Sequence, residues 1–156
     1  MFRIGIISDT HNFLDPKVPG LFAGVDHILH AGDIGSTAII QQLKTIAPVT
    51  AVLGNTDDPG LQFKLTELVQ LAGRKFWVQH IVDPAALERA LQIRVTQDQI
   101  AVVVFGHTHK PFSQTIGSTL FFNPGSAGKA RFGLPRTLAI LHCLPKELRP
   151  EYLKLD

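Results

Sequence analysis

The chain has 156 residues, of which 45% are apolar and 18% are charged, and its formal net charge is +2. This length and composition predict one globular domain over residues 1–156 and exclude a disordered chain. The small net charge gives no support for a membrane surface or a nucleic acid as a partner, so a nucleic acid enters only as a substrate.

The cysteine content and the apolar runs indicate the compartment. Cys143 is the single cysteine, which excludes an internal disulfide and favours a reducing environment. The short apolar run before Ser8-Asp9 is not a signal peptide, and no run approaches the roughly 18 residues of a membrane span. We therefore expect a cytoplasmic protein.

The first half of the chain predicts a βαβαβ unit whose strands lead into polar loops. The expected elements are a strand over residues 2–7, a short helix from Asp15-Pro16, a strand over 26–31, a helix over 36–44 that Ser36 can cap, and a strand over 49–53. This alternation is typical of a parallel sheet. Such sheets bind ligands at the carboxyl ends of their strands.

The second half of the chain contains hairpin signals. The expected elements are strands over residues 65–71 and 75–79 joined by Ala72-Gly73-Arg74, a helix over 83–91, a strand over 100–105, and strand pairs over 112–116 with 120–123 and over 137–144 with 147–155. Pro150 should place the last strand at a sheet edge. Because hairpins imply antiparallel strands in a second sheet, the predicted fold is α/β, a two-sheet β-sandwich of mixed strands flanked by helices.

Metal-binding side chains follow five of the predicted strands. They are Asp9, His11, Asp33, Asn55, His80, His107 and His109. The paired residues are spaced i, i+2, which puts both on one face in extended backbone. Seven nitrogen and oxygen ligands without a thiolate suit Mn, Fe, Zn or a similar ion, and they fit two ions that share a carboxylate. Two ions about 3.5–4 Å apart clamp a phosphate and lower the pKa of a bridging water, whose hydroxide attacks phosphorus.

The ordered set of motifs resembles that of the calcineurin-like metallophosphoesterases over almost the whole chain. The motifs are Asp9-Thr10-His11, Gly32-Asp33, Gly54-Asn55, His80 and Gly106-His107-Thr108-His109. Gly54-Asn55-Thr56-Asp57 and Asn123-Pro124-Gly125-Ser126 resemble the small bacterial and archaeal phosphodiesterases of that superfamily. The resemblance implies a four-layer α/β/β/α fold and two divalent ions, with Mn expected and Fe, Zn, Ni or Mg as alternatives.

The resemblance also implies a role for each residue. One ion would be held by Asp9, His11 and His109, the other by Asn55, His80 and His107, and Asp33 would bridge them. The implied reaction is hydrolysis of a small-molecule phosphodiester by a metal-bridging hydroxide. Asp33, Asn55 and His80 would be catalytic, and Asn55 and Thr56 would contact the substrate.

Two positions depart from the family pattern. Thr56 stands where the superfamily usually has a histidine that contacts the phosphate, so we expect weaker hydrolysis of esters with poor leaving groups. Ile81 follows His80 where glycine is usual, so we expect a more restricted backbone and a looser second metal site.

Other functions and a homo-oligomer are left open by the sequence. A non-catalytic scaffold for protein binding, like the retromer small subunit, would use exposed apolar residues such as Phe112, Phe121 or Phe132. The retention of all seven ligands favours an enzyme over a scaffold. A phosphomonoesterase or a nuclease would use the same site.

Several further polar residues have a structural interpretation. Asp57 and Asp58 are expected to cap loops, and His27 and His30 to pack or to support ligands. Lys129, Arg131 and Arg136 are expected to be solvated charges, and His142 and Cys143 to lie in the core.

Overall fold

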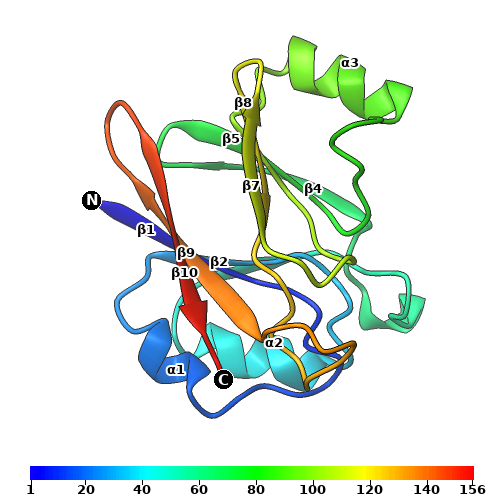
Figure 1. Cartoon of the computed structure of the whole chain (residues 1–156), viewed down its shortest axis with the longest axis vertical. Helices are drawn as coiled ribbons and strands as arrows, with labels where there is room; N and C mark the ends of the chain where they lie inside the picture. Colours follow the sequence, from blue (N-terminus) through cyan, green and yellow to red (C-terminus); the bar gives the residue numbers. More distant parts are fainter.

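The computed structural model describes residues 1–156, which form two five-stranded sheets with three α-helices (Figure 1). The first sheet has the order β10-β9-β1-β2-β3. Its strands are β1 (Phe2–Ile7), β2 (His27–His30), β3 (Val49–Ala51), β9 (Thr137–Cys143) and β10 (Leu148–Lys154). β1, β2 and β3 are parallel, and β9 is antiparallel to both of its neighbours. Pro150 lies in the edge strand β10, as predicted.

The second sheet has the order β4-β5-β6-β8-β7. Its strands are β4 (Thr66–Leu71), β5 (Arg74–Gln79), β6 (Val102–Val104), β7 (Phe112–Ile116) and β8 (Thr119–Asn123). The hairpins β4–β5 and β7–β8 are antiparallel as predicted, but β5, β6 and β8 pair in parallel. The predicted mixture of strand directions is therefore confirmed, and the parallel part arises because the long connection that carries α3 is a crossover between parallel strands.

The two sheets pack face to face through one apolar layer. Ile4 and Ile6 of β1 pack in one cluster with Val102 and Val104 of β6. Ile7 points to the opposite face, as the two-residue period of a strand requires, and packs in the layer beneath α1 and α2. The predicted sandwich is therefore confirmed.

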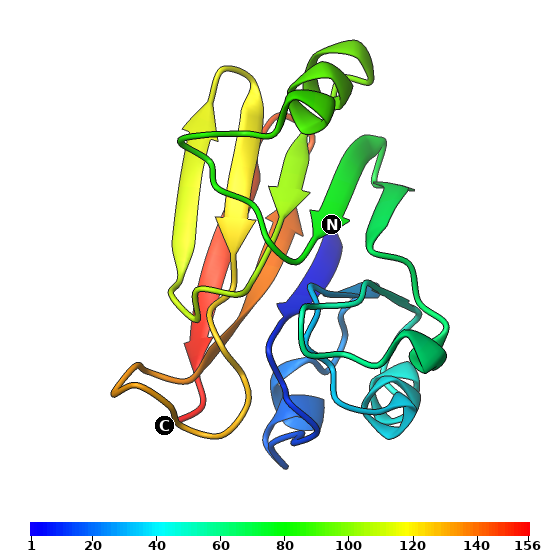
Figure 2. The same cartoon turned by 90° about the vertical axis from the view of Figure 1, so that its right-hand side faces the viewer.

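Helices cover the outer faces of both sheets. α1 (Val18–Leu21) and α2 (Thr37–Lys44) cover the first sheet, and α3 (Arg89–Gln97) covers the second. Figure 2 shows α3 on the far side of the sheets from α1 and α2. A single 3-10 turn, η1, spans Pro59–Leu61, and no helix has the length and apolar character that a bilayer crossing needs.

Two local predictions were wrong in detail. Asp83 accepts a hydrogen bond from the backbone N–H of Ala85, which closes a turn, and the helix begins only at Arg89. Ser36 occupies the N-terminal cap position of α2, but its hydroxyl donates to Asn12 Oδ1 and makes no capping bond. In the first place a local turn contact replaces the expected cap, and in the second a contact with a distant loop replaces it.

Candidate metal centre

The loops that follow β1, β2, β3, β5 and β6 bring all seven predicted ligands together. Asp9 and Asp33 lie at the centre and are almost fully buried. Asp9 Oδ1 lies 3.7 Å from His11 Nε2, 3.7 Å from His80 Nε2 and 3.3 Å from His109 Nε2. Asp33 Oδ2 lies 3.7 Å from His11 Nε2 and 3.2 Å from His80 Nε2.

These distances define two overlapping groups of ligand atoms. Asp9, His11 and His109 form the first, which is the set that the resemblance implied for one ion. Asp9, Asp33 and His80 form the second, so Asp9 belongs to both groups, and Asp33 Oδ2 also lies within 3.7 Å of His11 Nε2 in the first.

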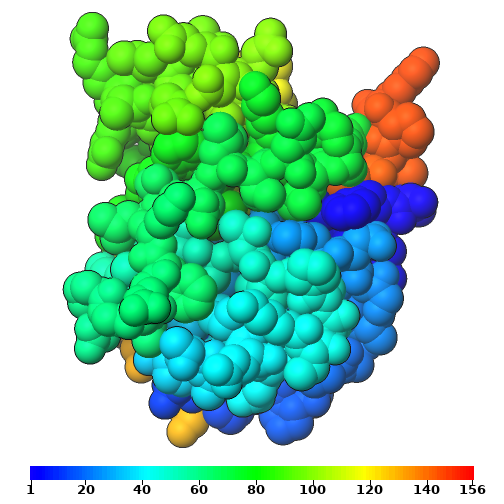
Figure 3. Space-filling view, turned by 180° about the vertical axis from the view of Figure 1, so that it is seen from behind, coloured from blue at the N-terminus to red at the C-terminus, as the bar shows by residue number.

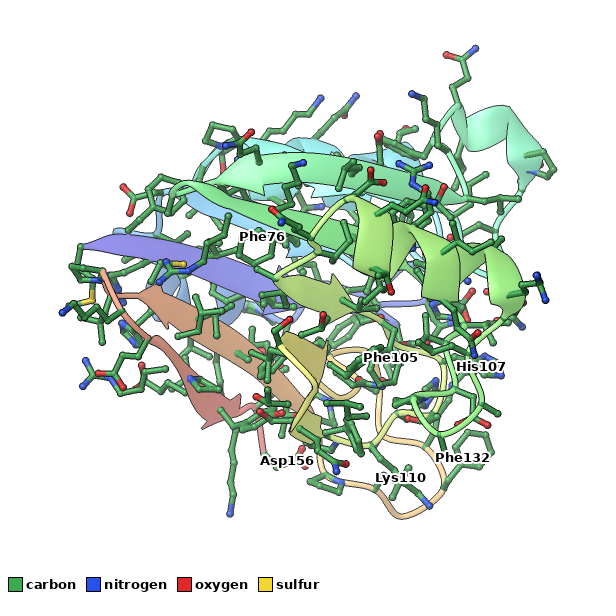
Figure 4. The ribbon with its side chains drawn as sticks, turned by 90° about the horizontal axis from the view of Figure 1, so that it is seen from above. Phe76, Phe105, His107, Lys110, Phe132 and Asp156 are labelled. Atoms are coloured by element: carbon green, nitrogen blue, oxygen red, sulfur yellow. The ribbon has the colours of Figure 1, made fainter.

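Asn55 and His107, which the resemblance assigned to the second ion, lie outside the two groups of ligand atoms. Both are exposed, and His107 Nδ1 lies 3.1 Å from Asn55 Oδ1, so the two side chains are hydrogen-bonded to each other. The ring of His107 is edge-on to the ring of His80, with 5.3 Å between their centroids. Figure 4 shows His107 at the same end of the molecule as Lys110 and Phe132.

The chemistry of the buried atoms fits metal ions. Asp9 Oδ1, His11 Nε2 and His80 Nε2 are buried and have no hydrogen-bond partner. A buried polar atom without a partner costs about 1–3 kcal/mol, so three such atoms that face one another are unfavourable in a purely structural cluster. Divalent cations held by the two groups of ligand atoms would satisfy all three.

The remaining side-chain atoms of His80, Asp9 and Asp33 are held by the protein. His80 Nδ1 donates to the backbone carbonyl of Ala31 at 2.7 Å, which leaves Nε2 as the free lone pair. Asp9 Oδ2 accepts from Ser8 Oγ at 2.7 Å, and Asp33 Oδ1 accepts from the Thr56 N–H at 2.9 Å. Each carboxylate therefore presents its other oxygen to the centre.

Glycines allow the loops to approach these carboxylates. A Cβ atom on Gly54 would lie 2.1 Å from Asp33 Oδ1, and a Cβ atom on Gly106 would lie 2.1 Å from Ser8 Oγ. No side chain fits at either position without displacing the ligand or its hydrogen-bond partner.

The backbone of the ligand loops is not extended. Five of the seven ligands have a positive φ, which is 56° for Asp9, 46° for His11, 54° for Asp33, 72° for His107 and 62° for His109. The sequence argument that i, i+2 residues share one face of an extended strand was therefore wrong, although the pairs do converge. A non-glycine residue in the left-handed region costs roughly 1–3 kcal/mol, and such strain gathers at functional sites.

In the centre, neighbouring charges and hydrogen bonds outweigh the effect of burial on the pKa values of Asp33 and His80. Burial raises the pKa of Asp33, but the adjacent ring of His80 and the hydrogen bond from the Thr56 N–H lower it more, and the net pKa lies well below the usual range. Burial lowers the pKa of His80, but the adjacent carboxylates of Asp33 and Asp9 leave that pKa raised overall. The carboxylates therefore stay ionised and attract positive charge.

Two supporting contacts involve residues that the sequence placed outside the site. His30 is fully buried, where its Nε2 bonds with Thr10 Oγ1 at 3.0 Å and its Nδ1 accepts from the Gly32 N–H at 3.2 Å. Burial lowers the pKa of His30 to about 4. His30 therefore supports the loop before Asp33, in agreement with its predicted supporting role.

Asp57 ties two ligand loops together. Its carboxylate accepts from the backbone N–H groups of Ile34, Gly35 and Gly54 at 3.0, 3.0 and 2.9 Å. Asn123, which the sequence analysis named only within a motif of the resemblance, is fully buried and donates to the carbonyl of Gly106 at 3.0 Å. No spacing in the sequence distinguishes these supports from ordinary loop residues.

Several surface predictions were wrong. Arg136 is not a solvated charge, because its guanidinium pairs with Asp15 Oδ2 at 2.7 Å and both side chains are mostly buried. Phe121 lies in the core, so of the three proposed docking residues only Phe132 is strongly exposed, at 81%. Ile81 does not have a positive φ, so the backbone after His80 does not require glycine.

The sequence matches a known family over most of its length. The match is to the calcineurin-like phosphoesterase superfamily domain and covers residues 2–146. A probable metallophosphoesterase of Methanocaldococcus jannaschii is 36% identical over 130 residues, which cover 79% of this chain and 67% of that protein. A phosphodiesterase of the same organism is 30% identical and covers 94% of this chain and 96% of that protein.

Solved structures show the same fold. Vps29 of Chaetomium thermophilum aligns with a TM-score of 0.82 at 18% identity, covering 100% of this chain and 87% of that chain. At this identity the likeness concerns the architecture alone.

Proposed function

Because this chain belongs to the calcineurin-like phosphoesterase superfamily, we propose that it is a metal-dependent phosphodiesterase that hydrolyses small-molecule phosphodiesters. The observation that most strongly supports this proposal is a set of buried ligand atoms without hydrogen-bond partners. They are Asp9 Oδ1, His11 Nε2 and His80 Nε2. Two divalent ions are proposed at this set, with Mn as the expected metal. The 30% identity to a phosphodiesterase supports a diester over a monoester.

Each residue of the centre has a distinct proposed role. Bound ions would supply the positive charge that binds the phosphoryl oxygens and acidifies a water molecule. Asp33 Oδ2, between His11 and His80, would be the shared ligand. The exposed Asn55 uses its Oδ1 toward His107, which leaves its amide N–H groups free to donate to a phosphoryl oxygen.

This chain has no evident acidic side chain that would protonate the departing ester oxygen. Thr56 is exposed beside Asn55, and its hydroxyl does not release a proton near neutral pH. Activated aryl diesters are therefore the expected substrates, because an aryl oxide leaves without protonation.

The proposal is tested by assaying purified protein against an aryl phosphodiester, the matching aryl phosphomonoester and single-stranded nucleic acid, each with EDTA and with added Mn. We expect metal-dependent turnover of the aryl diester to exceed that of the other two. A Lys44→Ala variant on exposed α2, away from the centre, is the matched control and should keep full activity.

Each other outcome identifies a different function. Preference for the monoester or the nucleic acid would replace the diesterase with a phosphomonoesterase or a nuclease at the same centre. Absence of metal-dependent turnover on all three would contradict the enzyme and favour the scaffold alternative.

A further inference from the structure

A pocket of about 760 Å³ adjoins the metal centre on the side of β5 and α3. Two of the ligand residues, Asn55 and His80, form part of its wall, so the pocket opens directly beside the proposed ions. Figure 3 shows the segment of α3, at the top, and the segment that follows β3, along the same edge of the molecule. The volume of the pocket lies within the range of small-molecule binding sites.

The wall of the pocket is mainly apolar. Leu65 is 68% exposed, Ile81 is 50% exposed and Ile93 is 42% exposed, and all three belong to the lining. These side chains come from three separate parts of the chain, the segment before β4, the end of β5 and helix α3. Large aliphatic side chains gathered around one opening indicate an apolar ligand more than a solvated surface.

Trp77, which is almost fully buried, forms part of the pocket wall. The indole N–H donates to Gln79 Oε1 at 3.0 Å, so the polar edge of the ring is already satisfied within the wall. The guanidinium of Arg94 lies 5.0 Å from the ring centroid and is paired with Asp98. The guanidinium therefore covers part of the indole ring, and the apolar area that a ligand can reach comes mainly from the aliphatic side chains.

We propose that this pocket holds an aromatic ester group of the phosphodiester and so determines which diesters are hydrolysed. This inference rests on the proposed function, because a phosphodiester bound at the ions must place its organic groups beside Asn55 and His80. The pocket is an apolar space whose wall includes those two residues. A planar aromatic group has the size and the apolar surface to fill the pocket beside Trp77 and the aliphatic rim. An aliphatic ester group of one carbon does not fill it.

The experiment measures binding without turnover. Trp77 is the only tryptophan, so its fluorescence reports the pocket alone. Protein loaded with Zn²⁺ is titrated with phenylphosphonate and with methylphosphonate, which present the same anion and differ only in the organic group. We expect phenylphosphonate to bind at least about ten-fold more tightly, because the wall discriminates by apolar contact.

Two variants from different elements make the wall polar without adding charge. Ile93→Gln and Leu65→Gln should each reduce the preference for phenyl over methyl by about ten-fold. Ile116→Gln is the matched control, because Ile116 is 41% exposed in β7 and is not part of the pocket. The control should keep the preference of the natural protein.

The outcomes separate this inference from the proposed function. Turnover of aryl diesters with no phenyl preference, or with a preference that both variants retain, would overturn the pocket assignment and leave the diesterase intact. A phenyl preference that both variants lose, in a protein without turnover, would support the aromatic site and reject the diesterase. If Ile93→Gln and Leu65→Gln instead convert a dimer to a monomer in sedimentation without changing the preference, the pocket is a contact between copies and the inference is wrong.

Discussion

Asp33 uses one carboxylate oxygen for the Thr56 N–H and presents the other to His11 and His80. Asp33→Asn keeps the shape of the side chain but removes the charge that two cations would share. Changes in the hydrogen-bond partners of metal ligands already cost about 10- to 100-fold, so we expect a loss of diesterase activity of at least about 100-fold. The far-ultraviolet circular dichroism should be unchanged. Full activity in this variant would exclude Asp33 as the shared ligand.

Thr56 is the residue whose replacement should change substrate range. A positioned acid contributes about 10²- to 10⁴-fold when the leaving oxygen is basic, and a threonine hydroxyl does not supply it. We expect the natural protein to show a steep dependence of rate on the pKa of the leaving phenol. Thr56→His should make that dependence shallower and favour poorer leaving groups. The measurement is a series of substituted phenyl diesters assayed on both proteins, and a shallow slope in the natural protein would show that another group supplies the proton.

His30 should make the stability depend on pH. Its pKa is about 4 in the fold because of burial, against an ordinary value of 6.5. As the pH falls below 6.5 the unfolded chain takes up a proton that the folded protein excludes, so this contribution to stability is complete above 6.5 and declines toward pH 4. Between about pH 7 and about pH 5 the loss is about 2 kcal/mol.

The test of this contribution compares how steeply the free energy of unfolding changes with pH, rather than its absolute value. Urea unfolding of metal-free protein should show that His30→Gln lowers the pH dependence by that amount. His27→Gln is the comparison, because His27 is only partly buried, at the other end of β2. Burial also lowers the pKa of His27, but less than that of His30, so this variant should remove less of the pH dependence. An equal slope in the natural protein and in His30→Gln would contradict the assignment of a neutral buried His30.

At the scale of the elements, the approach of one loop to another determines the geometry of the centre. Gly54→Ala would place a Cβ atom 2.1 Å from Asp33 Oδ1, so the loop after β3 or the carboxylate must move. We expect metal affinity measured by calorimetry to fall by at least about ten-fold. Gly20→Ala is the matched control, because Gly20 lies in α1 with no atom within 4 Å of its added Cβ. Unchanged affinity in Gly54→Ala would show that the close approach is not required.

Most strands were predictable because their apolar runs are bounded by turn residues. Leu71 pairs with Arg74 across Ala72-Gly73, which is the hairpin that the sequence indicated. Helix α3 was displaced because Asp83 was interpreted as a cap although it closes a separate turn. The spacing of Leu87, Leu91 and Val95, which pack on one cluster, was the better signal.

The ligands were predictable by type and order, but their backbone was not. Asp9 has a positive φ where its N–H donates to the Gly32 carbonyl and its own carbonyl accepts from the Gly128 N–H, and these long-range bonds cannot be read from the local sequence. The apolar pocket was also missed. Leu65, Trp77 and Ile93 belong to three elements, and only the fold places them beside the metal ligands.

At the scale of the whole molecule, the two sheets contribute different parts of one centre. The first sheet supplies Asp9, His11, Asp33 and Asn55, and the second supplies His80, His107 and His109. The centre forms only where the sheets pack face to face, as the bond from His80 Nδ1 to the Ala31 carbonyl shows. Metal binding should therefore stabilise the packing of one sheet on the other as well as the loops.

The central claim is that this junction holds two divalent ions, and elemental analysis of protein reconstituted with Mn tests it most directly. Metal-free protein is dialysed against Mn, freed of excess ion, and measured for metal and for protein in the same sample. The account predicts two equivalents per chain in the natural protein, with activity that rises as the second equivalent binds. A content that stays at one equivalent while the protein is fully active would contradict it.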